Sequence, residues 1–354
     1  MLDRDRLLPL GAVGVVVLFL FAVQLLGTAT DAAAPFLRRL IRQVVVGDAG
    51  ALGLGWLSSY ALGNGSVVAA LALSLFNADV LAVGQLFAMV AGSRLGAAAI
   101  VVVIGAIDYF QKERFSLQRS VSMGLLTFLL THSIYLPATA LGYVALPWVT
   151  GPVARSIPAL DPAVNPLGLF EAVTEGITAL LGPTLAFLFA VALLFGTLKL
   201  FDRLLASVET ATIRQRFFSH LRRTWVSFAI GLVVTTVTTS VAFSLGVIVP
   251  LYNRRYVQRE ELIPYVLGAN LGTLFDTLLV AVVLETGVGV AVVLALLGLA
   301  TLVTLGALVA HGPYSRLVVA MDDRLIEDRR LFVLFVLALA LVPAVLLLAP
   351  LAAA

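Results

Sequence analysis

The chain has 354 residues, of which 61% are hydrophobic and only 12% charged, and its formal net charge is +3. Soluble domains average about a quarter charged residues, so this composition excludes an ordinary soluble enzyme or a nucleic-acid-binding protein. The apolar runs Leu7–Gly27 and Leu331–Leu348 reach or approach the roughly 20 residues that cross a bilayer. The absence of cysteine excludes disulfides, thiol catalysis and Cys-based metal sites. The sequence therefore predicts an all-α integral membrane protein.

Two sequence blocks recur in the same order in the two halves of the chain. Phe19–Val23 returns as Phe187–Val191, and the Gly-bracketed stretch Gly92–Gly96 returns 176 positions later (268 − 92) as Gly268–Thr273. Each Gly-bracketed stretch lies inside an apolar segment, where backbone that breaks a helix is tolerated if it is buried or lines a wet cavity. Weak internal symmetry is a signature of secondary transporters. We therefore expect two copies of one unit, with a helix break in each Gly-bracketed stretch.

Each copy also has an apolar stretch that small polar residues interrupt. Trp56–Leu75 is interrupted at Gly63–Ser66, and Trp225–Leu251 is interrupted at Thr235–Ser240. Either stretch could be one helix whose hydroxyl groups bond to the preceding turn, or a re-entrant hairpin with a polar tip. If both are hairpins, 18 of the 23 Lys and Arg residues share one face, which the positive-inside rule makes cytoplasmic. The charge distribution therefore favours hairpins and a cytoplasmic N-terminus.

This topology gives seven spans and two inverted repeats, each with three spans and a re-entrant hairpin. The spans are expected near residues 7–27, 80–110, 120–147, 182–200, 262–284, 290–311 and 331–350. The expected domains are a first inverted repeat at 1–150, an extracellular linker and interfacial helix at 151–181, a second inverted repeat at 182–315, and a cytoplasmic loop with a final transmembrane helix at 316–354.

Two motifs of the second half resemble the type II sodium/phosphate cotransporter family. That family carries Gln-Ser-Ser-Ser and Gly-Ala-Asn-Ile-Gly-Thr-Thr once in each inverted repeat. Gly268–Thr273 reads Gly-Ala-Asn-Leu-Gly-Thr, and Thr235–Ser240 occupies the place of the hydroxyl cluster. The first half diverges, because Arg94 stands where the family has Asn, and in the second half Asp276 stands where it usually has Thr. The resemblance implies Na⁺-coupled symport of inorganic phosphate or a similar oxyanion.

Candidate site residues are those that offer oxygen atoms to Na⁺ or N–H and O–H groups to an anion. Hard cations take oxygen ligands, and half-helix N-termini in broken membrane helices point their positive ends at anions. The substrate-binding candidates are Asn64, Ser66, Ser93, Arg94, Thr238, Thr239, Ser240 and Asn270. The candidate sodium ligands are Thr235, Thr236, Asn270, Thr273 and Asp276.

Arg94 allows three interpretations. An arginine inside a membrane segment costs ~2.5–3.5 kcal/mol on insertion scales, so it is rarely left without a partner. Arg94 could form a fork for phosphate, or it could pair with Asp276, which explains both unusual charges together. A snorkelling side chain is the third interpretation. The pairing with Asp276 is slightly favoured.

The sequence thus predicts a multi-pass secondary active transporter of the cell membrane. The alternative is a transport-incompetent relative that acts as a membrane scaffold or partner protein. No phosphate-binding Gly-Lys-Ser/Thr loop and no nucleophile–base pair occurs, so we expect no enzymatic activity, no catalytic residues and no cofactor besides Na⁺ as the coupling ion. The expected partners are phosphate or a similar anion, Na⁺ and the lipid bilayer, with no nucleic acid; a homodimer is compatible with the sequence.

Overall fold

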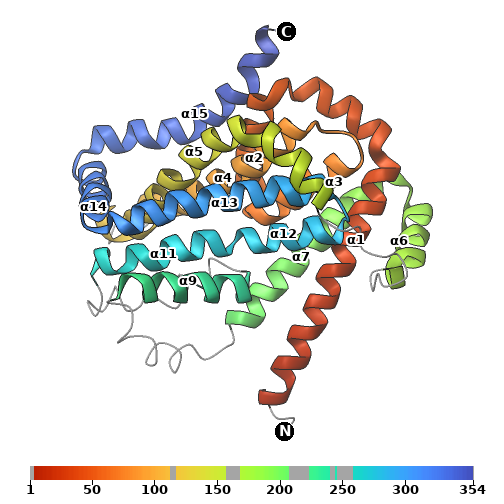
Figure 1. Cartoon of the computed structure of the whole chain (residues 1–354), viewed down its shortest axis with the longest axis horizontal. Coiled ribbons are helices and arrows are strands. Elements are labelled where there is room, and N and C mark those ends of the chain that lie inside the picture. The colour runs from red at the N-terminus through yellow and green to blue at the C-terminus, as the bar shows by residue number, and fades with distance from the viewer. Residues whose placement is uncertain are drawn as a thin grey trace.

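The structure, a computed structural model, describes residues 4–111, 117–156, 168–206, 223–239, 244 and 258–353 (Figure 1). Within these ranges the chain is helical apart from short turns, and they contain no strand, so the all-α prediction is confirmed. The helices are α1 (Arg4–Val44), α2 (Gly47–Leu62), α3 (Gly65–Asn77), α4 (Val83–Gln111), α5 (Leu117–Ser156), α6 (Gly168–Leu181), α7 (Pro183–Ala206), α9 (Thr224–Thr238), α11 (Arg259–Gly272), α12 (Leu274–Val283), α13 (Gly287–Val309), α14 (His311–Glu327) and α15 (Arg329–Ala353).

Six helical segments of the described ranges are long and apolar enough to cross a membrane. They cover Gly11–Val44, Gly124–Gly151, Pro183–Leu205, Arg259–Val283, Gly287–Val309 and Arg329–Ala352. Each corresponds to a span predicted from the sequence, and large apolar side chains such as Leu302 and Val309 are exposed on them, as on a surface that faces lipid. The seventh predicted span, near residues 80–110, is α4, which carries Arg94 and is not among these six.

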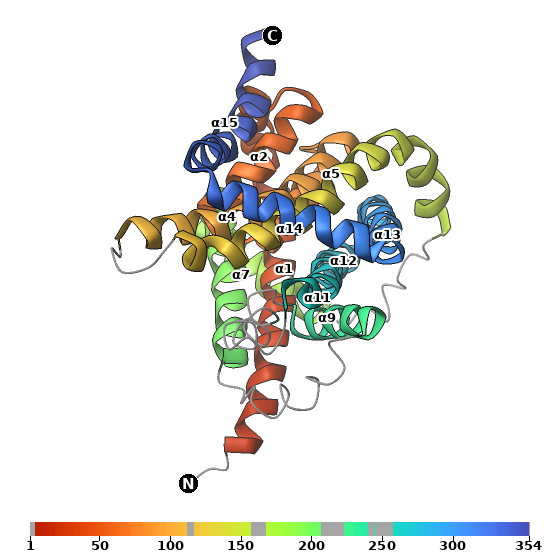
Figure 2. The same cartoon turned by 90° about the vertical axis from the view of Figure 1, so that its left-hand side faces the viewer.

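The first helix is longer than the sequence pattern predicted. The predicted span ends near residue 27, but α1 continues to Val44. The hydroxyl groups of Thr28 and Thr30 donate to the carbonyl oxygens of Gln24 and Leu26, at 3.2 and 2.6 Å, so these polar residues are accommodated inside the helix. α1 packs along α7, and its beginning lies at the opposite end of the molecule from the end of α15 (Figures 1 and 2).

A two-residue turn separates α2 from α3, where the sequence placed the tip of the first hairpin. Gly63 ends α2 with φ of +62°, a left-handed conformation that glycine adopts at little cost. Asn64 then caps α3, because its side-chain oxygen accepts hydrogen bonds from the backbone N–H groups of Ser66 and Val67 at 2.8 and 3.2 Å. α3 has 13 residues, or about 20 Å of helix, which is too short to cross the hydrocarbon core of about 30 Å.

The second half begins its corresponding stretch in the same way. α9 has 15 residues and ends at Thr239, whose φ of +49° is again left-handed. Thr239 lies 176 positions after Gly63, the same offset that relates the two Gly-bracketed stretches. The rest of the predicted second hairpin, apart from Ser244, lies outside the described residues.

Glycines bring α2 against α4 and α9 against α11 at the same relative positions. The contacts involve Gly55, Gly92 and Gly96 in the first pair and Gly231, Gly268 and Gly272 in the second, each again 176 positions later. A Cβ atom at Gly55 would overlap the carbonyl oxygen of Met89, and one at Gly231 would overlap that of Tyr265. Both pairs therefore depend on residues without a side chain, as close membrane-helix packing commonly does.

This packing corrects the expectation of a helix break in the first Gly-bracketed stretch, whereas the break expected in the second stretch is present at its last residue, Thr273. α4 runs through Gly92–Gly96 without interruption, and α11 includes Gly268–Gly272. The helix is interrupted only after them, at Thr273 between α11 and α12, whose φ of −69° and ψ of −17° are close to helical. The glycines serve the approach of a neighbouring helix and do not supply unusual dihedral angles.

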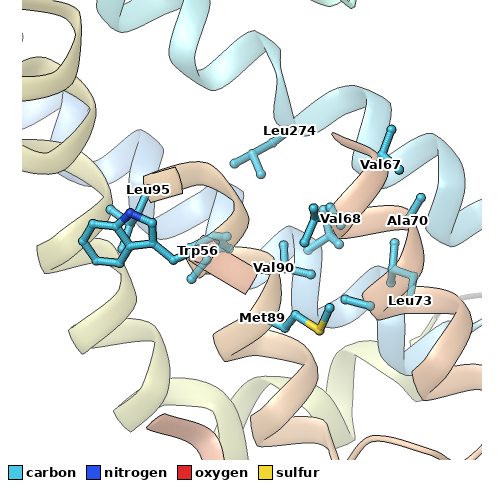
Figure 3. Packing of buried hydrophobic residues seen from close by; sticks show 14 of the residues in the cluster. Trp56, Val67, Val68, Ala70, Leu73, Met89, Val90, Leu95 and Leu274 are labelled. Atoms are coloured by element: carbon cyan, nitrogen blue, oxygen red, sulfur yellow. The ribbon is translucent and has the colours of Figure 1, made fainter. Parts of the chain in front are cut away.

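The core joins the two halves of the chain. α12 packs on α3, where Leu274 lies opposite Val67 and Val68 (Figure 3). All three side chains are fully buried. This contact places the junction of α11 and α12 beside the N-terminal end of α3 and the middle of α4, where the candidate site lies.

Candidate functional site

The guanidinium group of Arg94 lies at the centre of the site. Arg94 is 5% exposed, and its three nitrogen atoms all donate hydrogen bonds. Nη1 donates to the carbonyl oxygen of Thr273 at 3.2 Å, and Nη2 donates to the hydroxyl of Thr277 at 3.3 Å. Nε lies 3.4 Å from the hydroxyl of Ser93. Arg94 of the first half is therefore anchored on the α11–α12 junction of the second half.

Asp276 lies on the other side of Thr277. The Thr277 hydroxyl, which accepts from Arg94, donates to Oδ1 of Asp276 at 3.0 Å, so one hydroxyl connects the two charged groups. The charge of Arg94 also acts on the Asp276 carboxylate through space, and the side chain of Ser66 interacts with that carboxylate. Among the contacts of the described residues, Arg94 and Asp276 meet through Thr277 and not as a direct ion pair. Oδ2 of Asp276 is buried and has no hydrogen-bond partner among them.

Asn270 and Thr273 form the second-half side of the site. The carbonyl oxygen of Asn270 accepts hydrogen bonds from the hydroxyl of Tyr135 at 2.8 Å and from that of Thr273 at 2.7 Å. The side-chain nitrogen of Asn270 is buried without a partner among the described residues. A buried amide normally has hydrogen-bond partners, so this unpaired group makes Asn270 a candidate for binding a ligand or water.

The hydroxyl groups of α9 differ in their bonding. Thr235 and Thr236 have buried hydroxyl oxygens with no hydrogen-bond partner among the described residues, and Thr235 packs against Gly272 next to the α11–α12 junction. The hydroxyl of Thr238 donates to the carbonyl of Val234 at 2.7 Å, a bond inside its own helix. Thr239 ends the helix, and Ser240 lies outside the described residues.

The remaining first-half candidates have structural hydrogen bonds. Asn64 uses its side-chain oxygen to cap α3. The hydroxyl of Ser93 donates to the carbonyl of Val90 at 2.7 Å, inside α4. The structure thus brings Ser66, Ser93, Arg94, Thr273 and Asp276 together, whereas Asn64 and Thr238 are engaged in local bonds.

Sequence reasoning missed two residues of the site, Tyr135 and Thr277. Tyr135 is buried on α5, and its hydroxyl reaches the carbonyl oxygen of Asn270 from that separate helix. Its only signal was a large polar side chain in a predicted span. Thr277 follows Asp276 directly, and a hydroxyl beside an intramembrane carboxylate was the available signal for it.

The arrangement fits a hard cation in the second half. The side chain of Asn270 and the hydroxyls of Thr235 and Thr236 have unpaired polar atoms, and an amide oxygen or a hydroxyl oxygen suits Na⁺. The amide of Asn270 can bind a cation through its oxygen or an anion through its nitrogen. No cluster of three His, Cys, Asp or Glu residues that could hold a metal ion lies within the described ranges.

Six helices long and apolar enough to cross a membrane identify a multi-pass membrane protein, and buried polar side chains gather in its interior. A family model described as Na+/Pi-cotransporter matches residues 192–313, which is 122 of the 354 residues and includes α9 and α11 to α13. The match supports membership of the chain in the Na+/Pi-cotransporter family, as the sequence motifs predicted. The matched part excludes Arg94 and the first half, in keeping with the divergence seen there. No curated protein and no solved structure matches the chain.

Proposed function

We propose that the chain is a secondary active transporter that couples the movement of inorganic phosphate, or a similar oxyanion, to Na⁺. The family consists of transporters, and sodium–phosphate cotransport is its activity. The observation that carries the proposal for this chain is the group of unpaired buried polar atoms on Asn270, Thr235 and Thr236, inside the part that matches the family.

The proposed Na⁺ site lies between the end of α9 and the α11–α12 junction. Thr235, Thr236 and Asn270 would supply neutral oxygens, because their polar side-chain atoms have no partner among the described residues. Asp276 was also predicted as a ligand, and its Oδ2 is unpaired, but its charge is already compensated by Arg94 through Thr277. Thr273 is the weakest of the five predicted ligands, because its hydroxyl is bonded to Asn270 and its carbonyl accepts from Arg94.

The proposed anion site uses Ser66, Ser93 and Asn270, with Thr239 and Ser240 as further candidates. Arg94 stays a candidate through its positive charge, which attracts an anion even when the guanidinium is held by the protein. Its three nitrogens already donate to Ser93, Thr273 and Thr277, which speaks against a free fork for phosphate. Asn64 and Thr238 would act indirectly, because their side chains support the ends of α3 and α9.

We further propose that two inverted repeats, with the domain limits given above and a cytoplasmic N-terminus, rock against each other around this site. The constant offset of 176 positions between corresponding glycines and helix ends supports two structural copies. Rocking of one repeat against the other is a common form of alternating access in transporters with such repeats. These findings give no support to a homodimer, and none is proposed.

The scaffold alternative is not better supported. A protein whose site is permanently closed has no reason to keep several polar atoms buried without partners, because each costs about 1–3 kcal/mol. The second half keeps such atoms at Thr235, Thr236 and Asn270.

Uptake of labelled phosphate into proteoliposomes tests the proposed function. An inward Na⁺ gradient should drive uptake above the level seen without a gradient. Well-folded protein that shows no gradient-driven uptake would favour the scaffold.

A further inference from the structure

Arg94 and Asn270 occupy the same position of the two structural copies. Gly92 and Gly96 flank Arg94, and Gly268 and Gly272 flank Asn270. Gly92 packs against the carbonyl of Leu52, and Gly268 packs against that of Phe228, the residue 176 positions after Leu52. The backbone surroundings of the two residues therefore correspond, and the difference between the copies lies in the side chains.

The two copies differ in whether their polar groups are satisfied. In the second half, Asn270 and Thr235 carry buried polar atoms without partners among the described residues. In the first half, the residue that corresponds to Thr235 is Ser59, whose hydroxyl donates to the carbonyls of Gly55 and Ser93 at 3.0 and 3.1 Å. The residue that corresponds to Asn270 is Arg94, and its three nitrogens are bonded. The polar groups at the first-half position are thus all bonded to other protein groups, whereas those at the second-half position include buried atoms without a partner among the described residues.

The groups that surround Arg94 are those that a hard cation prefers. They are the hydroxyls of Ser93 and Thr277, the carbonyl of Thr273 and, through Thr277, the carboxylate of Asp276. Hydroxyl, carbonyl and carboxylate oxygens are the ligands that alkali and alkaline-earth ions take in proteins. A guanidinium group here supplies one positive charge to an oxygen-rich site in the low-dielectric interior, where an unpaired carboxylate would be costly.

We infer that the guanidinium of Arg94 is a tethered cation, which takes the place of a mobile coupling ion in the first half of the site. This inference rests on the proposed Na⁺-coupled function. Because the charge is covalently attached, it compensates Asp276 in every state of the transport cycle and is never released. The first-half position therefore adds no Na⁺ to the coupling stoichiometry, and the mobile ion binds only in the second half.

The inference is tested by giving the first half the residue of the second. The full-length Arg94→Asn variant, purified in detergent, is unfolded by heat in NaCl and in choline chloride of equal ionic strength. Removal of the tethered charge should create a Na⁺ site between the introduced amide, Thr273 and Asp276. Na⁺ should therefore raise the Tm of this variant by at least about 2 °C more than it raises that of the wild type, since a ligand that binds only the folded state stabilises it.

Two further variants provide the controls. Arg94→Lys keeps a tethered positive charge and should respond to Na⁺ as the wild type does. Arg94→Asn combined with Asp276→Asn removes the carboxylate and should lose the gained response. If Arg94→Asn does not fold, Arg94→Gln replaces it, and binding of labelled ²²Na⁺ to the purified variant gives a second measurement.

An Arg94→Asn or Arg94→Gln protein that is folded and binds no more Na⁺ than the wild type would overturn the inference. Its failure can be distinguished from failure of the proposed function. Wild-type protein that shows Na⁺-driven phosphate uptake, together with variants that gain no Na⁺ response, would refute the tethered cation alone. Variants that gain Na⁺ binding while the wild type transports no phosphate would refute the proposed function alone.

Discussion

Arg94, on α4, donates a hydrogen bond from Nη1 to the carbonyl oxygen of Thr273, at the junction of α11 and α12, across a distance of 3.2 Å. The bond joins two residues that are 179 positions apart and belong to different halves of the chain. A charged group of one half thus holds the interrupted helix of the other, and the stability of the site should depend on this connection.

Removal of either buried charge should destabilise the protein more than removal of both. Breaking a buried charge pair by deleting one partner typically costs about 3–5 kcal/mol, whereas replacing both charges can be nearly neutral. Arg94→Ala and Asp276→Ala should each lower the Tm of the detergent-solubilised protein, and the double variant should recover most of the loss. Thr277→Val, which removes the bridging hydroxyl, should give a smaller loss. Strictly additive losses in the double variant would show that the two charges do not interact.

Asn270 should determine the response to Na⁺. Asn270→Ala removes an amide whose nitrogen has no partner among the described residues, so it should weaken Na⁺-dependent uptake more than it lowers the yield of folded protein. Thr301→Val is the matched control, because the Thr301 hydroxyl is satisfied inside its own helix by the carbonyl of Leu297. Unchanged Na⁺ dependence in folded Asn270→Ala protein would remove this residue from the cation site.

The glycines of α11 and α9 should not tolerate a methyl group. A Cβ at Gly268 would overlap the carbonyl oxygen of Phe228, so Gly268→Ala should destabilise by about 1–3 kcal/mol or force α9 away from α11. Gly298 of α13 is the control, since a Cβ there meets no atom within 4 Å. Gly298→Ala should leave the Tm unchanged or raise it. Equal Tm values for the two variants would show that close packing at Gly268 is not required.

The buried carboxyl group of Asp322 should make stability depend on pH. Asp322, on α14, is fully buried, and burial raises its pKa to about 7 in spite of Arg259 at 3.1 Å. The folded protein therefore holds a proton that the unfolded chain has already lost between about pH 4 and pH 7, so the free energy of unfolding should fall as the pH rises through this range. Asp322→Asn should flatten this dependence in thermal unfolding measured from pH 5 to pH 8. An unchanged pH dependence in the variant would assign the effect to other groups.

Cysteine labelling tests the topology in this naturally Cys-free chain. The proposed topology places Arg203 and Gln258 on the cytoplasmic face and Gln43 on the opposite face, and all three side chains are exposed. Single cysteines at Arg203 and Gln258 should both be protected from an impermeant reagent in intact cells, and one at Gln43 should react. Opposite labelling at the first two positions would exclude a re-entrant second hairpin.

The sequence predicted the parts of the fold that depend on local pattern. Apolar length identified the spans, and the polar interruption Gly63–Ser66 lies where α2 ends and α3 begins. Gly92 and Gly96 were interpreted as a helix break, whereas α4 is continuous there and the two glycines allow α2 to approach. The same residue type serves both purposes, and only the position of the neighbouring helix distinguishes them.

The sequence predicted which residues belong to the site better than it predicted the hydrogen bonds between them. The unusual charges of Arg94 and Asp276 could be related because each was out of place in an apolar segment. Thr277 as the bridge between them and Tyr135 as a partner of Asn270 could not be derived, since both depend on how distant helices pack. Tertiary contacts between helices that are far apart in sequence leave no periodic signal in either of them.

The central claim is that Na⁺ drives the movement of phosphate through this protein. The most direct measurement is the uptake of labelled phosphate into sealed proteoliposomes under an inward Na⁺ gradient. Controls are liposomes without protein, an equal choline gradient, and an ionophore that dissipates the Na⁺ gradient. The account predicts transient accumulation of phosphate above its external concentration, abolished by the ionophore and reduced by Asn270→Ala. Phosphate uptake by folded wild-type protein that is the same in Na⁺ and choline, or absent in both, would contradict it.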